Sequence, residues 1–139
     1  NVVILAYTII RRFLTTLNNV CGVYIVSGNH DRVSPKIDGD PYGSVAGLLA
    51  FMLRENTPLD VRHNAVLLGI EIDGIFYILT YRIVDEKQVD QANYRQIAVA
   101  PLFTGNFYSE SNGWNSSAGY TILVNNGCGK PNVFEYVLS

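Results

Sequence analysis

The chain is poor in charge and in the side chains that bind metals. Only 16% of its 139 residues are charged, the net charge at pH 7 is −2, and there are two histidines and two cysteines. A zinc site normally needs three or four such ligands, and a two-metal site needs more. We therefore expect no metal centre, and interpret Gly28-Asn29-His30-Asp31, a fragment of a metallophosphoesterase signature, as a turn. The net charge also argues against broad electrostatic capture of nucleic acid, but not against a local basic patch.

The sequence lacks long hydrophobic runs and recognised nucleotide-binding glycine patterns. No apolar run approaches the roughly 20 residues of a membrane-spanning helix. No P-loop or dinucleotide-binding motif is present, so we expect no cofactor. A hydrophobic content of 48% excludes a disordered chain. The length predicts a single domain over residues 1–139 with a real core.

The two cysteines and one sequon indicate in which cellular compartment the protein is found. Cys21 and Cys128 are the only cysteines, and Asn115 begins the sequon Asn-Ser-Ser. An even cysteine count and a glycosylation site at Asn115 both fit a secreted protein, in which the thiols are structural or form one disulfide. The chain begins at Asn1 without Met or a visible signal peptide, so we interpret it as a processed, secreted chain.

Residues 65–83 contain the clearest structural signal. Two apolar runs flank Asp73-Gly74, which supplies the two positive-φ positions of a type I′ turn. A two-residue turn sets the register, so Ile70 should face Tyr77. Tyr77 then lies among aliphatic residues on the more apolar face, either as a core tyrosine or in a ligand pocket. A hairpin that is apolar on one face and mixed on the other belongs to a sheet covered on at least one side.

The remaining segments predict one α+β domain with a mixed or antiparallel sheet, an amphipathic helix near the N-terminus and few other helices. We expect strands over 2–7, 20–26, 121–124 and 133–138, a helix capped by Thr8 and running to Leu17, a surface helix within 84–99, and loops over 27–44, 54–64 and 100–120. The apolar run 45–53 fits a buried strand or a buried helix equally well. We interpret Arg11 and Arg12 as a solvated helix face. Trp114, in a polar loop, either packs under that loop or stacks on a sugar or base.

Several segments, taken in order, resemble the ribosome-inactivating proteins, which are plant rRNA N-glycosylases. They are Tyr7-Thr8-Ile9-Ile10-Arg11-Arg12 after an opening strand, Cys21-Gly22-Val23-Tyr24-Ile25-Val26, the hairpin segment 69–81, Phe103-Thr104-Gly105-Asn106-Phe107-Tyr108 and the tail 118–138. The resemblance touches about half of the chain. It implies a compact or truncated relative, a secreted defence protein that binds adenine or ribosomal RNA.

The resemblance also implies roles for individual residues. Tyr77 takes the place of the first adenine-stacking tyrosine. Phe107 and Tyr108 follow the Gly-Asn turn that supplies the second, although Tyr108 is one position late. Trp114 takes the place of a tryptophan of the substrate site. In some members a cysteine at the position of Cys21 pairs near the C-terminus, so we predict a disulfide between Cys21 and Cys128.

The chain departs from the family in the catalytic region. Family members carry a helix with Glu and Arg three residues apart between the second tyrosine and the tryptophan, whereas only five residues separate Tyr108 from Trp114 here. Glu110 is the carboxylate best placed to contribute. Stacking binds adenine but does not protonate it or stabilise the sugar cation, so we expect weak or absent depurination. The alternative is a non-enzymatic, β-rich lectin or membrane-targeting cytolysin that uses the aromatic stretch from Phe103 to Tyr120 and binds glycans or lipid headgroups.

Overall fold

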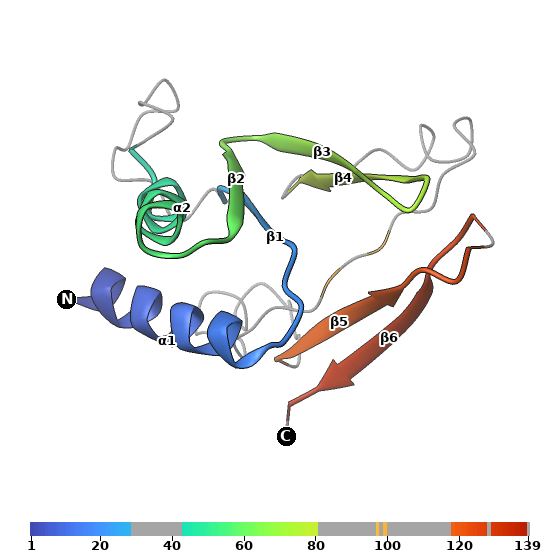
Figure 1. The fold of residues 1–139 in the computed structure, drawn as a ribbon, viewed down its shortest axis with the longest axis horizontal. Coiled ribbons are helices and arrows are strands. Elements are labelled where there is room, and N and C mark those ends of the chain that lie inside the picture. The colour runs from blue at the N-terminus through green and yellow to red at the C-terminus, as the bar shows by residue number, and fades with distance from the viewer. Residues whose placement is uncertain (29–42, 81–96, 98, 100–117, 128, 139) are drawn as a thin grey trace, which may run out of the picture. The chain divides into compact units, whose positions relative to one another are not determined.

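The computed structural model describes residues 1–28, 43–80, 97, 99, 118–127 and 129–138, which contain two helices and six strands (Figure 1). The helices are α1 (Val2–Thr16) and α2 (Val45–Asn56), and the strands are β1 (Gly22–Val26), β2 (Asp60–Asn64), β3 (Leu67–Ile72), β4 (Ile75–Thr80), β5 (Gly119–Val124) and β6 (Asn132–Val137). The chain divides into two compact units, one of residues 1–70 and 76–83, the other of residues 71–75 and 84–139. Each is described by itself.

The first helix begins earlier than the sequence predicted. Residues 2–7 belong to α1, so the predicted opening strand is wrong. The Asn1 side chain accepts a hydrogen bond from Val3 N at 3.0 Å and caps the helix. Thr8 lies inside the helix and donates to the Ile4 carbonyl at 2.8 Å, so it is not the cap. The β-branched residues near the start of the segment favour a strand locally. The Asn1 cap and the packing of one face of the segment on the core stabilise a helix instead.

A β1–α2–β2 unit forms the centre of the first compact unit. β1 and β2 pair in parallel, from Gly22 opposite Asp60 to Val26 opposite Asn64. A parallel pair needs a crossover connection, and α2 lies within that connection and packs on both strands. The predicted strand over 20–26 is confirmed, and the ambiguous run 45–53 is helical. The predicted loop 54–64 is wrong, because α2 continues to Asn56 and β2 follows at Asp60.

The core of this unit is small and centred on α2. Leu53 is fully buried, and Ala50 and Val61 are nearly so. Seven half-buried apolar side chains from α1, β1, α2 and the turn before β2 pack around them: Tyr7, Ile10, Leu14, Val23, Ile25, Leu49 and Leu59. The core therefore joins one face of α1 and one face of α2 to the parallel strands.

The predicted hairpin is present as β3 and β4. Asp73 and Gly74 alone separate the strands and have φ values of 51° and 74°, as a type I′ turn requires. Ile70 is buried and Tyr77 half-buried, whereas Phe76 on the opposite face is 66% exposed. The Phe76 ring covers Gly69, where a Cβ would lie only 2.8 Å from it. The predicted division into a more and a less buried face is therefore confirmed.

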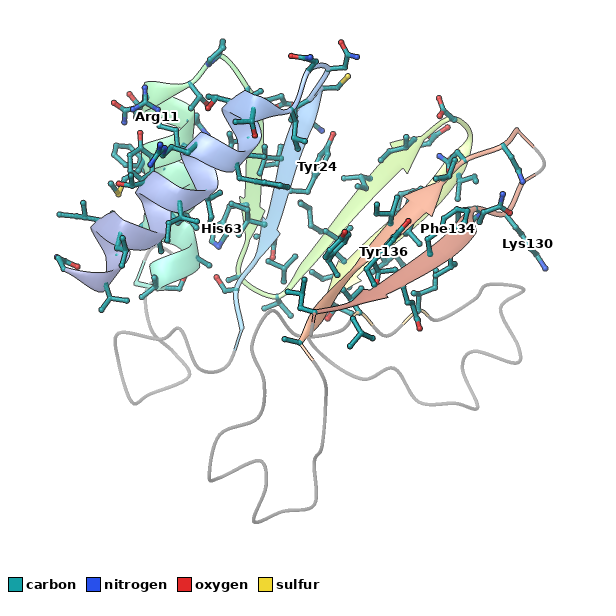
Figure 2. All side chains as sticks on the ribbon, turned by 90° about the horizontal axis from the view of Figure 1, so that it is seen from below. Arg11, Tyr24, His63, Lys130, Phe134 and Tyr136 are labelled. Atoms are coloured by element: carbon teal, nitrogen blue, oxygen red, sulfur yellow. The ribbon has the colours of Figure 1, made fainter. Side chains whose placement is uncertain are left out.

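In the second unit, β5 and β6 form an antiparallel pair. Tyr120 lies opposite Tyr136, and their rings stack with centroids 4.9 Å apart and an interplanar angle of 13°. Figure 2 labels Phe134 and Tyr136 of β6. We call the five aromatic and aliphatic side chains on this face the aromatic ladder: Tyr120, Ile122, Val124, Phe134 and Tyr136. In the same unit, Asn125 Nδ2 donates to the Ile72 carbonyl at 3.2 Å. The strands predicted over 121–124 and 133–138 are confirmed, with slightly different bounds.

The described residues thus form a mixed α+β fold with small sheets and an N-terminal helix, as the sequence predicted. The sheets contain one parallel and one antiparallel pair besides the β3–β4 hairpin. Most of the predicted surface helix over 84–99 and of the aromatic loop over 100–120 lies outside the described residues. The single domain over residues 1–139 stays a prediction.

Candidate functional site

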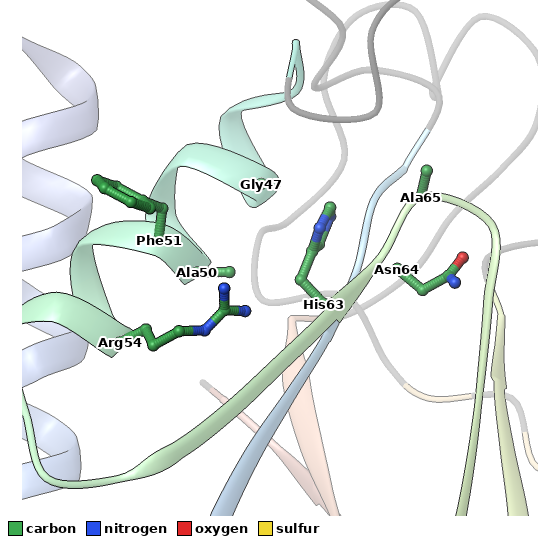
Figure 3. A pocket seen from close by; sticks show the side chains of 7 residues that line it. All are labelled: Gly47, Ala50, Phe51, Arg54, His63, Asn64 and Ala65. Atoms are coloured by element: carbon green, nitrogen blue, oxygen red, sulfur yellow. The ribbon is translucent and has the colours of Figure 1, made fainter.

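A cavity lies between α2 and the end of β2. Its volume is about 270 Å³, close to the lower end of the range for small-molecule sites. Figure 3 shows its lining: Gly47, Ala50, Phe51 and Arg54 come from α2, and His63, Asn64 and Ala65 come from the end of β2 and the residue after it. An aromatic ring, a guanidinium and an imidazole therefore line one small space.

The topology explains why polar side chains gather at this place. β1 and β2 are parallel, so both end at the same edge, and α2 begins there too. Ligands of α/β folds bind outside the carboxyl ends of parallel strands, near helix N-termini. Ser27 directly follows β1, Ser44 directly precedes α2, and His63 lies next to the last residue of β2. The three side chains are distant in sequence and meet because the crossover brings those ends together.

A buried hydrogen-bond chain joins these three side chains. Ser27 Oγ lies 2.8 Å from Ser44 Oγ and 2.8 Å from His63 Nε2. Ser44 Oγ also accepts from Gly47 N at 2.9 Å and so caps α2. Ser27 and Ser44 are both buried, and Ser27 N donates to the Asn64 carbonyl at 3.2 Å. The chain therefore ties the helix cap to the ends of both strands.

The chain has a direction, because each hydroxyl carries one proton. If Ser27 donates to His63 Nε2, Ser44 donates to Ser27. Ser44 then still accepts from Gly47 N, so all three hydrogen bonds are made. If His63 Nε2 carries the proton, Ser27 donates to Ser44 instead. In both arrangements the Ser27 hydroxyl fixes the imidazole of His63 at Nε2.

Arg54 and Phe51 give the cavity its charge and its flat surface. Arg54 Nε donates to the Val61 carbonyl at 3.1 Å, which anchors the guanidinium beside β2. Within the described part of the chain no acidic side chain pairs with Arg54. Phe51 is 53% exposed, so one of its faces is open to a ligand. A guanidinium without an acidic partner among the described residues, beside an exposed ring, suits a planar ligand that carries negative charge.

Arg62, on β2, contrasts with Arg54. It does not line the cavity, and its Nη2 lies 2.8 Å from Asp60 Oδ2. The hydrogen bond and the charge of Asp60 raise the pKa of Arg62 above its ordinary value. Arg62 is therefore a neutralised surface cation, and Arg54 is the cation that faces the cavity.

The arrangement suits binding better than nucleophilic catalysis. A serine next to a histidine is the pairing that activates a nucleophile. Ser27, however, is only 4% exposed and is not a lining residue of the cavity. Its hydroxyl is used to support His63. The described residues also contain no group of three or more His, Cys, Asp or Glu side chains that is able to hold a metal ion.

The residues predicted from the sequence are mostly not placed by the structure. Tyr77 is half-buried on β4 and does not line this cavity. Cys21 is exposed before β1, with Sγ 3.7 Å from the Asn19 carbonyl oxygen. The other predicted site residues lie outside the described residues: Phe107, Tyr108, Glu110, Trp114, Asn115 and Cys128. Their roles, and the Cys21–Cys128 disulfide, stay predictions.

The sequence interpretation missed the cavity because it treated residues 27–44 and 54–64 as loops. Two local signals were present. Ser44 stands directly before an apolar run, as a helix cap does, and Ser27 directly follows an apolar strand. β2 gave little signal, because four of its five residues are polar. No protein-family model matches this chain, and no significant match was found among curated proteins or among solved structures.

Proposed function

We propose that the chain is a defence-type binding protein for an adenine-containing ligand, a nucleotide or RNA, and that the α2–β2 cavity takes the base. The observation that carries this proposal is the convergence of Phe51, Arg54 and His63 on one small cavity. The ring of Phe51 provides a stacking face, which is worth about 1–3 kcal/mol per base. Arg54 provides a cation for a phosphate, and the imidazole of His63, held by Ser27, provides part of the cavity wall. The resemblance to ribosome-inactivating proteins supports the same ligand class.

The cavity volume limits what enters it. With a volume of about 270 Å³, just below the usual range for small-molecule sites, the cavity suits a nucleobase, and the sugar and phosphate would lie at its mouth. Arg54 is an exposed residue on the wall, a suitable place to meet a phosphate there. We therefore expect adenosine monophosphate to bind more tightly than adenine.

Titration calorimetry with adenosine monophosphate on the 139-residue chain tests the proposal. Phe51→Ala should weaken binding by about tenfold, as expected for the loss of one stacking contact. Arg54→Gln should weaken the binding of adenosine monophosphate but leave the affinity for adenine nearly unchanged. Arg62→Gln is the matched control, because Arg62 is outside the cavity. Absence of binding to any adenine-containing ligand at millimolar concentration would overturn the proposed function.

A parallel variant separates the cavity from the tyrosine that the resemblance implies. If Tyr77→Ala abolishes adenine binding and Phe51→Ala does not, adenine is the ligand but it binds at Tyr77. If Phe51→Ala alone has the effect, the cavity is the site. Depurination is a separate measurement: adenine release from ribosomes should be weak, and any strong release that Glu110→Gln removes would show that the shortened catalytic region still works.

A second candidate function is glycan binding without catalysis, as in a small lectin. The observation that favours it is the aromatic ladder, whose five side chains are each 42–45% exposed. Exposed aromatic faces stack on sugar rings, and tyrosine hydroxyls add hydrogen bonds. Binding on a glycan array that is lost in Tyr136→Ala, with no adenine binding, would favour this candidate over the first.

A further inference from the structure

The outer side of α1 is apolar although it faces away from the core. Tyr7, Ile10 and Leu14 occupy the inner side and pack on the core. A second row follows at intervals of three or four residues along the helix and its C-cap, which places its members on one side of the helix. We call this row the outer stripe: Val2, Leu5, Ile9, Phe13 and Leu17, which are 82%, 61%, 58%, 60% and 46% exposed.

The outer stripe needs a cover. Together the inner row and the outer stripe make more than half of the helix circumference apolar, and a helix with so wide an apolar surface is normally buried over most of it. Five large apolar side chains in a continuous exposed row also exceed the scattered exposure that is normal for a surface. The feature to explain is therefore what lies against this side of α1.

The charge next to the outer stripe favours an anionic occupant. Arg11 and Arg12 are the only charged side chains in residues 1–30, and both are exposed. Among the described residues neither arginine forms an ion pair. Arg12 lies three residues after Ile9, on the edge of the stripe, where its stem can follow the apolar surface while its head stays at the water, whereas Arg11 lies on the side of α1 opposite the stripe. An apolar row bordered by a cation, on a helix without acids, suits the surface of an anionic membrane.

A second copy of the chain is a poorer occupant. Two α1 helices meeting at their outer stripes would place the Arg12 side chains of both copies at the contact, with no acidic residue on either helix to neutralise them. Like charges held close in an apolar contact oppose association. No described helix is long and apolar enough to cross a bilayer. A helix of 15 residues can instead lie flat in the headgroup region, with the outer stripe among the acyl chains.

We propose that the outer stripe of α1 docks on the surface of an anionic lipid bilayer. Leu5, Ile9 and Phe13 enter the acyl boundary, and Arg12 contacts lipid phosphates and carboxylates at its edge. The inner side of α1 keeps its packing on the core, so no rearrangement of the fold is needed. The docking is independent of the adenine-binding cavity.

Vesicle co-sedimentation of the full 139-residue chain tests this proposal. The protein should bind vesicles of phosphatidylcholine with phosphatidylserine, and bind vesicles of phosphatidylcholine alone more weakly. Leu5→Glu should lower the partition coefficient by more than about tenfold, because it removes one buried apolar side chain and adds a charge. Arg12→Gln should lower it by about fivefold on anionic vesicles, with little change on neutral ones.

The matched controls are Phe76→Glu and Arg62→Gln, which change equally exposed side chains elsewhere in the same unit. Both should leave partitioning unchanged, and circular dichroism should show that Leu5→Glu keeps its helix content. Absence of vesicle binding, or equal loss from Leu5→Glu and Phe76→Glu, overturns the proposal. A concentration-dependent dimer that Leu5→Glu abolishes, without vesicle binding, overturns it in favour of self-association.

Discussion

The β1–α2–β2 unit and the β5–β6 hairpin use apolar residues in opposite ways. In the first, α2 covers a parallel pair, and Leu53, Ala50 and Val61 are at most 4% exposed. In the second, the five residues of the aromatic ladder form a continuous row but remain 42–45% exposed. The parallel pair exists only because a helix crosses it, whereas the antiparallel pair is made by neighbouring segments of the chain. Stability in the first comes from a shared core and in the second from contacts between facing side chains.

The largest expected effect comes from the centre of the helical core. Leu53→Ala should lower the free energy of unfolding by about 3 kcal/mol, because it leaves a cavity at a fully buried position. Urea unfolding followed by circular dichroism at 222 nm measures this change. Leu48→Ala on the same helix is the matched control, since Leu48 is 45% exposed, and it should cost much less. Equal losses would mean that Leu53 is not the centre of the core.

The next effect concerns the cap that joins α2 to the strand ends. Ser44→Ala should cost about 1–2 kcal/mol, because it removes the acceptor of Gly47 N and a partner of Ser27. Asn1→Ala removes the cap of α1 at an exposed end and should cost less. Thermal unfolding of the two variants gives the comparison. A larger loss from Asn1→Ala would show that the buried chain from Ser44 to His63 contributes little.

The hairpin offers a substitution that should stabilise. Thr121 Oγ1 is buried in β5 and has no hydrogen-bond partner among the residues that the structure describes. Thr121→Val keeps the shape and removes the unsatisfied hydroxyl, so it should raise stability by about 1 kcal/mol. Thr121→Ser keeps the hydroxyl, loses the methyl group and should destabilise. Hydrogen exchange of the amide of Leu138, which donates to the Ala118 carbonyl, reports on this hairpin. Faster exchange in Thr121→Val would contradict the interpretation.

The smallest effect should come from the stacked tyrosines. Tyr136→Ala should weaken the β5–β6 pair by about 0.5–1.5 kcal/mol, because it removes one cross-strand aromatic contact. Tyr136→Phe keeps the ring and should have almost no effect. Amide exchange across β5 and β6 distinguishes the two variants. If Tyr136→Phe costs as much as Tyr136→Ala, the hydroxyl and not the stacking holds the hairpin.

Features that depend on near neighbours in the chain follow from local sequence patterns. Asp73-Gly74 specifies a two-residue turn wherever it lies, because few other dipeptides adopt two positive φ values. Side chains alternate between the two faces of a strand. The turn therefore places Ile70 and Tyr77 on one face of the hairpin and Phe76 on the other. The strand at 20–26 and the strands of the C-terminal hairpin were found for the same reason, since their apolar runs are short and bounded by polar residues or glycine.

The other features depend on packing between segments that are distant in the sequence. Residues 2–7 are equally apolar as strand or helix, and packing of Tyr7 on the core favours helix. β2 is a strand because β1 pairs with it and Val61 enters the core, not because of its own polar sequence. Ser27 lies 17 positions before Ser44 and 36 before His63. Only the right positioning of two parallel strand ends and a helix start brings them together, and no local pattern encodes a contact across such a separation.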